Sequence, residues 1–316
     1  MPHNNNIGAN LLKYAISTKL FELGYIPYII GYKNRPNDDI SFIIKNSNLR
    51  IVNNFTEIKK NDYDILMVNS DQTWRKWPKF FYDIAFLCFA KNWKINKFIY
   101  GASLPYSKWK FNKTDENMAK NCLKNFKGIS VREKGSIDQI QKHLEIKASF
   151  VLDPTFLIDK KYYLNIINNF TFKNLTNKNY IFIYLIFNDK KIKKFINTSS
   201  KKLNYTIFRV SKRHKDSVKK FIYGIYNSKA VITDSYHGTV FSIIFRKPFI
   251  TFFTKQDLNL RFISLRETFN IEERFIENNR IADLNLLTTP LNIDENLMNS
   301  LKLKSIDYIK TTLNLF

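Results

Sequence analysis

Residues 231–242 combine an apolar strand pattern with groups suited to acid–base chemistry. The polar residues that follow the apolar run are Asp234, Ser235, His237, Gly238 and Thr239. Because histidine titrates near neutral pH, His237 could act as a general acid. A helical pattern begins at Val240, so the amides of Gly238 and Thr239 would lie in a first helical turn, where they could hold an anion. A structural interpretation stays open, in which Asp234 or Ser235 caps the helix and His237 only packs.

Arginine and small polar residues follow two other apolar runs. Arg132 comes directly after 129–131, where its forked donors could clamp a carboxylate or phosphate. The alternative is a surface pair with Glu133 that carries little energy. Residues 68–74 end in Ser70, Asp71, Gln72, Thr73 and Trp74. Polar groups before a tryptophan suit sugar hydroxyls and an apolar sugar face, although Ser70 alone is more typical of a turn or helix cap.

Two further segments supply weaker candidates for anion binding. Asn6 and Gly8 precede the amphipathic stretch 11–23, where a glycine near a helix start could cradle a phosphate. Lys255 and Arg261 follow the apolar run 248–253 and could add positive charge at a strand end.

The sequence also predicts the strands and helices that position these candidate residues. Short runs rich in Ile, Val, Phe and Tyr alternate with stretches of helical period, a pattern typical of a parallel sheet flanked by helices. The expected strands are 25–31, 64–70, 97–103, 128–132, 149–153, 180–187, 205–210, 230–234 and 248–253. We therefore predict an α/β protein with two Rossmann-like domains that face a cleft. Ligands of such sheets bind beyond the carboxyl ends of the strands, where the candidates fall.

The domain boundary is predicted near the Asp153–Pro154 step. Proline forces the residue before it into an extended conformation and ends the strand, and residues 155–178 form the expected crossing. This gives an N-terminal domain over 1–158 and a C-terminal domain over 159–316.

The amino-acid composition limits the classes of protein to which this chain can belong. The chain has 316 residues, with 51 Lys and Arg against 27 Asp and Glu, a formal net charge of +24. Such a charge first indicates a polyanion, nucleic acid or an anionic membrane. However, only 11 of the 51 basic residues are Arg, and a Lys- and Asn-rich composition is typical of an AT-rich genome. No nucleic-acid motif is recognisable, so nucleic acid is not expected as the main partner.

Targeting and cysteine patterns indicate a cytoplasmic, reducing setting. No secretory signal is visible after Met1, and no apolar stretch is long enough to span a membrane. Cys88 and Cys122 cannot make a disulfide framework, and their spacing matches no zinc pattern. We expect both to be buried, inert thiols.

Taken together and in this order, the motifs resemble the polysaccharide pyruvyl transferase family. The segments that carry the resemblance span about residues 5 to 275 and are 6–9, 20–25, 70–74, 100–103, 130–133, 151–156, 232–242, 247–248, 259–262 and 271–274. Members of the family usually open with a strand before the glycine turn, whereas this chain begins almost at the turn, so the first strand of the N-terminal domain is expected to be missing.

The resemblance implies a fold similar to GT-B glycosyltransferases and transfer of a pyruvyl group from phosphoenolpyruvate to a sugar. The product would usually be a 4,6-linked ketal on a surface-glycan precursor. His237 and Arg132 match positions that the family uses for catalysis and donor binding, and Lys255 or Arg261 would supply a further basic residue. Asp71 or Asp234 would take a proton from the attacking hydroxyl or orient His237.

The expected partners follow from this chemistry. They are phosphoenolpyruvate on the C-terminal side and a glycan or lipid-linked saccharide on the N-terminal side, with peripheral contact with the anionic inner face of a membrane. No cofactor and no metal are needed. The alternatives are a GT-B-like glycosyltransferase that uses a nucleotide sugar, and a non-catalytic basic protein that binds polyanions.

Overall fold

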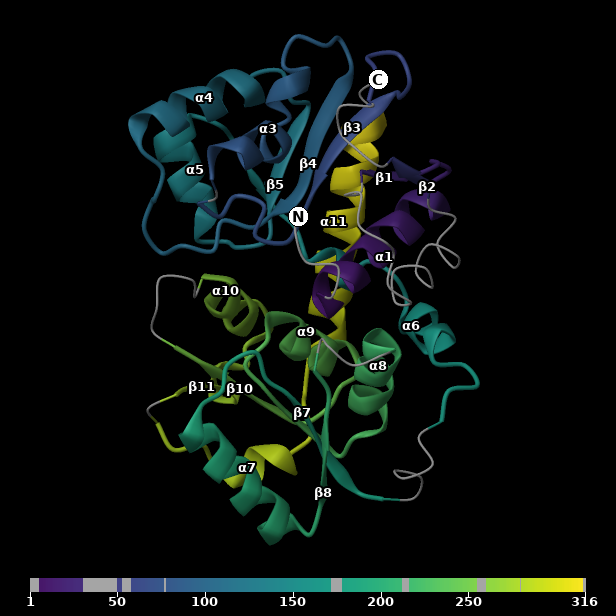
Figure 1. Cartoon of the computed structure of the whole chain (residues 1–316), viewed down its shortest axis with the longest axis vertical. Helices are drawn as coiled ribbons and strands as arrows, with labels where there is room; N and C mark the ends of the chain where they lie inside the picture. The colour runs from purple at the N-terminus through teal and green to yellow at the C-terminus, as the bar shows by residue number, and fades with distance from the viewer. Residues whose placement is uncertain are drawn as a thin grey trace.

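The computed structural model describes residues 6–30, 50–52, 58–76, 78–171, 178–211, 216–254, 260–278 and 280–314. Two α/β units lie one above the other in Figure 1. We call the unit around the four-stranded sheet the first lobe and the unit around the five-stranded sheet the second lobe. Two parallel sheets in one chain confirm the predicted α/β class.

The sheet of the first lobe is parallel throughout. Its strands, in spatial order, are β3 (Ile65–Asn69), β4 (Asn96–Ala102), β5 (Gly128–Val131) and β6 (Ser149–Phe150). Side chains alternate along β4, so Ile99 packs into one core while Phe98 and Tyr100 pack into another. The core that contains Ile99 also takes in residues of α3 (Tyr82–Ala85), α4 (Lys113–Leu123) and α5 (Ser136–Leu144).

Helices from the two ends of the chain cover the opposite face of this sheet. They are α1 (Ile7–Glu22) and α11 (Glu295–Asn314), and Ile309 and Leu313 of α11 pack with Phe98. The backbone amide of Leu152 donates to Ser305 Oγ over 2.9 Å, which fixes α11 to the first lobe. The last helix of the sequence therefore completes the core of the first lobe (Figure 1).

The second lobe has the strand order of a doubly wound sheet. In spatial order the parallel strands are β8 (Thr206–Arg209), β7 (Tyr180–Tyr184), β9 (Ala230–Thr233), β10 (Phe249–Phe253) and β11 (Phe275–Glu277). Chain order reverses between β7 and β9, and ligands of open α/β sheets bind in the crevice at such a switch point. The helices of this lobe are α6 (Lys160–Ile166), α7 (Lys190–Leu203), α8 (Ser217–Asn227), α9 (Tyr236–Ile244) and α10 (Leu260–Phe269).

All nine predicted strands are confirmed, although several are shorter than expected. The strand predicted over 25–31 is β1 (Tyr28–Ile30), which pairs with β2 (Arg50–Val52) in a separate two-stranded sheet. Both β2 and β11 were missed, because each is a short segment among polar residues and does not belong to a longer apolar run. The first element of the described chain is α1, and residues 1–5 lie outside the described part.

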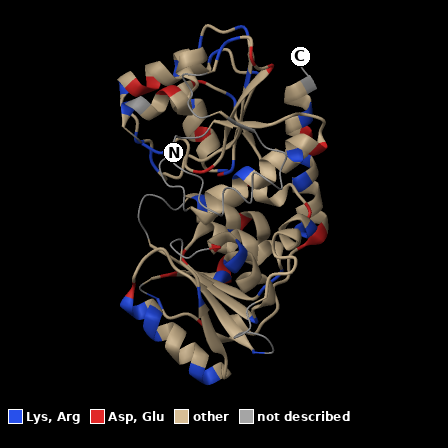
Figure 2. Cartoon of the chain, turned by 45° about the vertical axis from the view of Figure 1, so that its right-hand side comes forward, with Lys and Arg blue, Asp and Glu red and all other residues tan. Residues whose placement is uncertain are grey.

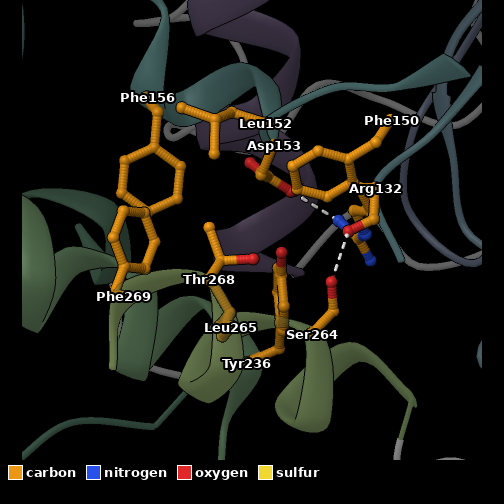
Figure 3. A pocket seen from close by; sticks show the side chains of 10 residues that line it. All are labelled: Arg132, Phe150, Leu152, Asp153, Phe156, Tyr236, Ser264, Leu265, Thr268 and Phe269. Carbon is orange, nitrogen blue, oxygen red and sulfur yellow. Dashed lines mark hydrogen bonds and ion pairs between the residues drawn. The ribbon is translucent and has the colours of Figure 1, made fainter. Parts of the chain in front are cut away.

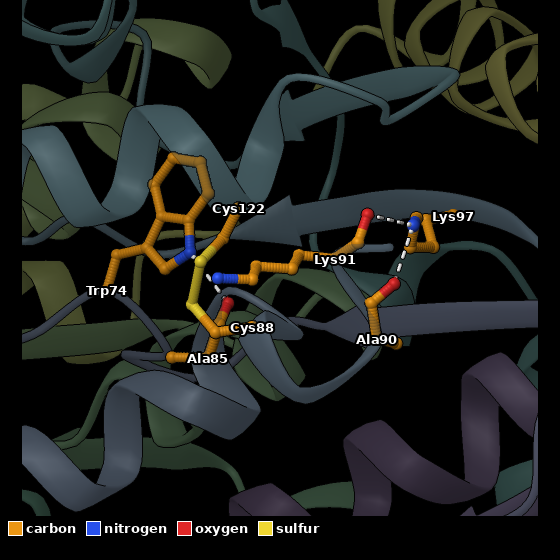
Figure 4. Close-up of a disulfide and its surroundings, with 7 residues drawn as sticks. All are labelled: Trp74, Ala85, Cys88, Ala90, Lys91, Lys97 and Cys122. Carbon is orange, nitrogen blue, oxygen red and sulfur yellow. Dashed lines mark hydrogen bonds between the residues drawn. A yellow bond between two sulfur atoms is a disulfide. The ribbon is translucent and has the colours of Figure 1, made fainter. Parts of the chain in front are cut away.

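The expectation of two free thiols is wrong for this structure. Cys88 in the short helix η3 (Cys88–Ala90) and Cys122 in α4 form a disulfide, with their Cα atoms 4.9 Å apart (Figure 4). The bond lies next to Trp74, whose indole N–H donates to the carbonyl oxygen of Ala85. The sequence separation of 34 residues gives no sign of this contact, because it arises only when α4 packs on η3.

None of the described helices combines the length and apolar character needed to cross a bilayer.

Candidate functional site between the lobes

The candidate site lies where strands of both lobes end, and the two lobes meet there through hydrogen bonds between the backbone of the first lobe and the Ser264 side chain of the second. The amide of Lys134, after β5, donates to Ser264 Oγ on α10 over 3.1 Å. Ser264 Oγ lies 3.3 Å from the carbonyl oxygen of Arg132. A small pocket between the lobes is lined by Arg132 and Asp153 on one side and by Tyr236 and Ser264 on the other (Figure 3).

His237 is buried in the first turn of α9 and faces the first lobe. Its Nε2 atom lies 3.8 Å from Asp153 Oδ2 and has no hydrogen-bond partner among the described residues. Burial lowers the pKa of His237 below its ordinary value, against the opposing influence of the Asp153 and Asp71 carboxylates. A buried imidazole with one uncommitted nitrogen is suited to exchange a proton with a ligand bound beside it.

Gly8 brings α1 against this imidazole. A Cβ atom at position 8 would lie 2.1 Å from His237 Nδ1, so any side chain there would displace the ring. Asn6, the N-cap of α1, accepts a hydrogen bond from the amide of Ala9 through its side chain and is exposed. The structure thus gives Gly8 and Asn6 packing and capping roles, and the predicted phosphate cradle stays a prediction.

Arg132 is the centre of a buried ionic network. Its Nη1 atom donates to Asp153 Oδ2 over 2.5 Å and its Nε atom to Glu133 Oε1 over 3.2 Å. Glu133 also accepts from Ser103 Oγ and from the amide of Leu104, so its oxygens are satisfied. The interpretation of Arg132 and Glu133 as a surface pair is therefore wrong, because both side chains are buried.

One end of the Arg132 fork is buried beside Asp71. Nη2 has no hydrogen-bond partner among the described residues and lies 3.7 Å from Asp71 Oδ1. The Asp71 side chain keeps 22% of its surface exposed. Asp71 can therefore meet a ligand while it adds negative charge beside Arg132.

Asp153 joins Arg132 to His237, and our sequence-based site did not include it. Burial works to raise its pKa, but the Arg132 guanidinium, His237 and the hydrogen bonds from Thr155 hold the pKa below its ordinary value. Oδ1 accepts from both the amide and the hydroxyl of Thr155, which fixes the carboxylate. Its position at the end of a strand, before Pro154, is the signal that could have identified it.

Tyr236 holds two guanidinium groups near one aromatic ring. The Cζ atom of Arg132 lies 4.4 Å from the ring centroid, and that of Arg261 lies 5.8 Å from it. Burial and the nearby Arg132 charge both lower the pKa of Arg261. Arg132 is already paired with Asp153 and Glu133, whereas Arg261 forms no ion pair with a described residue, so Arg261 is the cation that could best meet an anionic ligand.

Asp234 lies close in sequence to His237, but its carboxylate accepts hydrogen bonds from the loop after β7. Its two oxygens accept from the amides of Ile186 and Phe187, over 2.6 and 2.9 Å. The carboxylate therefore fixes the loop after β7 at the switch point of the sheet. Asp153 is the carboxylate that the structure places beside His237.

The first turn of α9 differs from expectation in one respect. Ser235 is the N-cap, and its Oγ atom accepts from the amide of Gly238 over 3.4 Å. The amide of Thr239 donates to the carbonyl oxygen of Ser235 over 3.0 Å. The expectation that Gly238 and Thr239 offer free amides to an anion is therefore wrong, because both amides already have acceptors. The Thr239 hydroxyl is also buried, 2.7 Å from the hydroxyl of Thr251.

The segment after β3 lies at the same edge of the first lobe. Ser70 Oγ is buried without a hydrogen-bond partner among the described residues, while Gln72 accepts a hydrogen bond from Arg75. Trp74 is buried in the core of the lobe, so it cannot stack on a sugar, contrary to our interpretation of the sequence. Lys255 lies outside the described residues.

Two facing α/β lobes, with a histidine, an arginine and a carboxylate brought together between them, define a GT-B-like fold. The chain belongs to the polysaccharide pyruvyl transferase family, whose model matches residues 6–254.

Solved structures agree on the fold. The chain is similar to UDP-GlcNAc 2-epimerase from Neisseria meningitidis bound to UDP-GlcNAc, with a TM-score of 0.59 and 12% identity over 96% of this chain and 97% of that one. It is also similar to MnaA of S. aureus in its UDP co-structure, with a TM-score of 0.57 and 12% identity over 98% and 95%. A kitacinnamycin glycotransferase matches with a TM-score of 0.56 and 7% identity over 98% and 97%. A comparison with curated proteins finds no match.

Proposed function

We propose that this protein transfers a pyruvyl group from phosphoenolpyruvate to two hydroxyls of a sugar in a surface-glycan precursor. The observation that carries the proposal is the arrangement of His237, Asp153 and Arg132, with Arg261 on the other side of Tyr236. Family membership supports it, because the family is that of the polysaccharide pyruvyl transferases.

The charges of the site suit the donor. Phosphoenolpyruvate carries about three negative charges near neutral pH, from one carboxylate and one phosphate. The Nη2 atom of Arg132 and the buried Arg261 would hold these groups, with the N-terminus of α9 adding partial positive charge. Lys255 is kept as a further candidate from the sequence.

His237 would supply the proton that starts the reaction. Protonation of the methylene carbon turns it into a methyl group and leaves the adjacent carbon electrophilic. Because burial lowers the pKa of His237, the free enzyme holds it neutral near pH 7. The negative charge of a bound donor would raise that pKa and so favour the protonated acid. Asp153 then acts as a positioning residue that steadies the imidazolium.

The acceptor would enter from the side of Asp71, Ser70 and Gln72, at the end of β3. One sugar hydroxyl forms a bond to the electrophilic carbon and loses its proton, for which Asp71 is the exposed base. The second hydroxyl attacks the same carbon and displaces phosphate, which takes up that hydroxyl's proton. The products are a cyclic ketal and inorganic phosphate, so atoms and charge balance.

A direct assay tests this proposal. The protein is incubated with phosphoenolpyruvate and β-galactosides or amino-sugar glycosides, while phosphate release and the mass of the glycoside are followed. Because general acids contribute about 10²- to 10⁴-fold, His237→Asn should lower the rate by at least about a hundredfold. Arg132→Lys should raise the KM for phosphoenolpyruvate, because lysine keeps the charge but loses the fork.

The matched control is His143→Asn, since His143 is stacked on Trp109 and paired with Glu116, away from the site. Thermal unfolding of each variant shows whether it is folded. Full activity in folded His237→Asn and Arg132→Lys would contradict the assigned roles. A melting shift with nucleotide sugars but none with phosphoenolpyruvate would instead favour the glycosyltransferase alternative.

A further inference from the structure

Helix α7 carries a continuous basic surface on the second lobe. It spans Lys190–Leu203, and Ile192 and Ile196 on its inner face are buried against the sheet. All of its lysines are exposed, and they are Lys190, Lys191, Lys193, Lys194, Lys201 and Lys202. This helix lies at the lower left of Figure 2, with Lys and Arg along its outer side.

The positive charge of this helix is not neutralised within the part of the chain that the structure describes. The sequence of α7 contains no acidic residue, and none of its lysines forms an ion pair with a described residue. The nearest acid along the chain is Asp189, the N-cap, which accepts from the amides of Lys191 and Ile192. Helix α4 differs, because its two lysines pair with Glu116 and Glu145.

Two large apolar side chains are exposed directly before this helix. Ile186 is 56% exposed and Phe187 is 63% exposed. The buried carboxylate of Asp234 accepts from both of their amides, so the backbone that presents them is held in place. An apolar pair fixed in water beside a lysine-rich helix is an arrangement that suits the interface of a bilayer.

We propose that the face formed by Ile186, Phe187 and the six α7 lysines docks on an anionic lipid bilayer. The lysines would contact the lipid phosphates, while the apolar pair would enter the boundary between headgroups and acyl chains. A nucleic acid offers the same phosphates but no apolar layer, so the exposed Ile186 and Phe187 favour the bilayer.

Docking in this way would bring the site close to the membrane. Asp234, which fixes the apolar pair, lies three residues before His237 and at the switch point of the second sheet. Ile186, Phe187 and the first turn of α7 therefore lie at the carboxyl edge of the sheet, as the site does, while Lys201 and Lys202 lie toward the amino edge, where β8 begins. The proposal does not rest on the transferase activity, since vesicle binding is measured without substrate.

The test is co-sedimentation of the full chain with vesicles. One set contains equal parts of phosphatidylglycerol and phosphatidylcholine, and the other contains phosphatidylcholine alone. We expect binding to the anionic set only. The variant K190Q/K191Q/K193Q/K194Q should weaken it by more than about tenfold, because it removes four charges that would attract the anionic lipids. Adding Phe187→Ser to this four-lysine variant should weaken vesicle binding further.

The matched control removes the same charge from the first lobe through K91Q/K94Q/K124Q/K127Q, four exposed lysines. Near-unchanged vesicle binding of this control supports the proposal. Equal loss in both variants would overturn it, because binding would then follow net charge alone. Equal binding to phosphatidylcholine vesicles, or binding to duplex RNA through the α7 lysines with none to vesicles, would also overturn it.

Discussion

The environment of His237 comes from residues that lie far apart in the sequence. Gly8 provides the surface against one ring nitrogen, and Asp153 lies near the other. Tyr236 packs edge-on against the same imidazole while it supports the two arginines. Each contact restricts the imidazole ring. The orientation of the ring therefore depends on the absence of a side chain at Gly8 as much as on the nearby carboxylate of Asp153.

The variant Gly8→Ala tests whether the orientation of the His237 ring depends on the absence of a side chain at position 8. The added Cβ atom would lie 2.1 Å from His237 Nδ1, so either the ring or α1 must shift. We expect kcat of the proposed reaction to fall by about 10²-fold, since a displacement near 1 Å can cost that much. The KM for phosphoenolpyruvate should change less, because the three atoms nearest to the added Cβ atom all belong to His237.

Ala9→Gly is the control, because it changes one methyl group on the same turn of α1 without adding an atom near His237. Its cost should be limited to helix propensity, about 1 kcal/mol of unfolding free energy. Similar losses of kcat in Gly8→Ala and Ala9→Gly would contradict the role assigned to the contact between Gly8 and the imidazole.

Among the elements, η3 and α4 are joined by the disulfide between Cys88 and Cys122. This bond closes a loop of the chain that contains β4. In a chain-entropy description, closing a loop of this length stabilises the fold by about 3–4 kcal/mol. We expect a reductant to lower the melting temperature of the protein. The variant C88S/C122S should melt near the reduced protein and should not respond to reductant. A wild-type protein whose melting temperature is the same with and without reductant would contradict the bond in solution.

Periodicity predicted the elements well where they are long or buried on both faces. The run that became β9 is apolar up to Thr233 and is followed by polar residues, so both the strand and the candidate residues after it were visible, whereas β4 and β7 were visible only as strands. The bond between Cys88 and Cys122 was not predictable, because it depends on how α4 lies across η3. The positions of Asp153 and Asp234 after apolar runs were visible in the sequence, but their partners were not, because these depend on which neighbouring segment each carboxylate faces.

At the scale of the whole molecule, the two ends of the chain join the lobes. Helix α1 packs its Leu11 and Tyr14 into the core of the second lobe, although its sequence precedes the first lobe. Helix α11 packs its Ile309 and Leu313 onto the first sheet, although it follows the second lobe. These exchanges hold the strand ends of both sheets around one site, and the sequence pattern alone does not reveal them.

Ile309→Ala tests whether the end of the chain stabilises the first lobe. Ile309 is fully buried against Phe98 and Tyr100, so its truncation should cost about 2–5 kcal/mol of unfolding free energy. Hydrogen exchange should show the loss of protection in β4, which α11 covers, before any loss in β7. Leu303→Ala is the control on the same helix, because Leu303 is 60% exposed and its truncation should change stability by less than about 0.5 kcal/mol. A loss of protection confined to β7 would show instead that α11 stabilises the second lobe, and the exchange of helices between lobes would then not hold the site together.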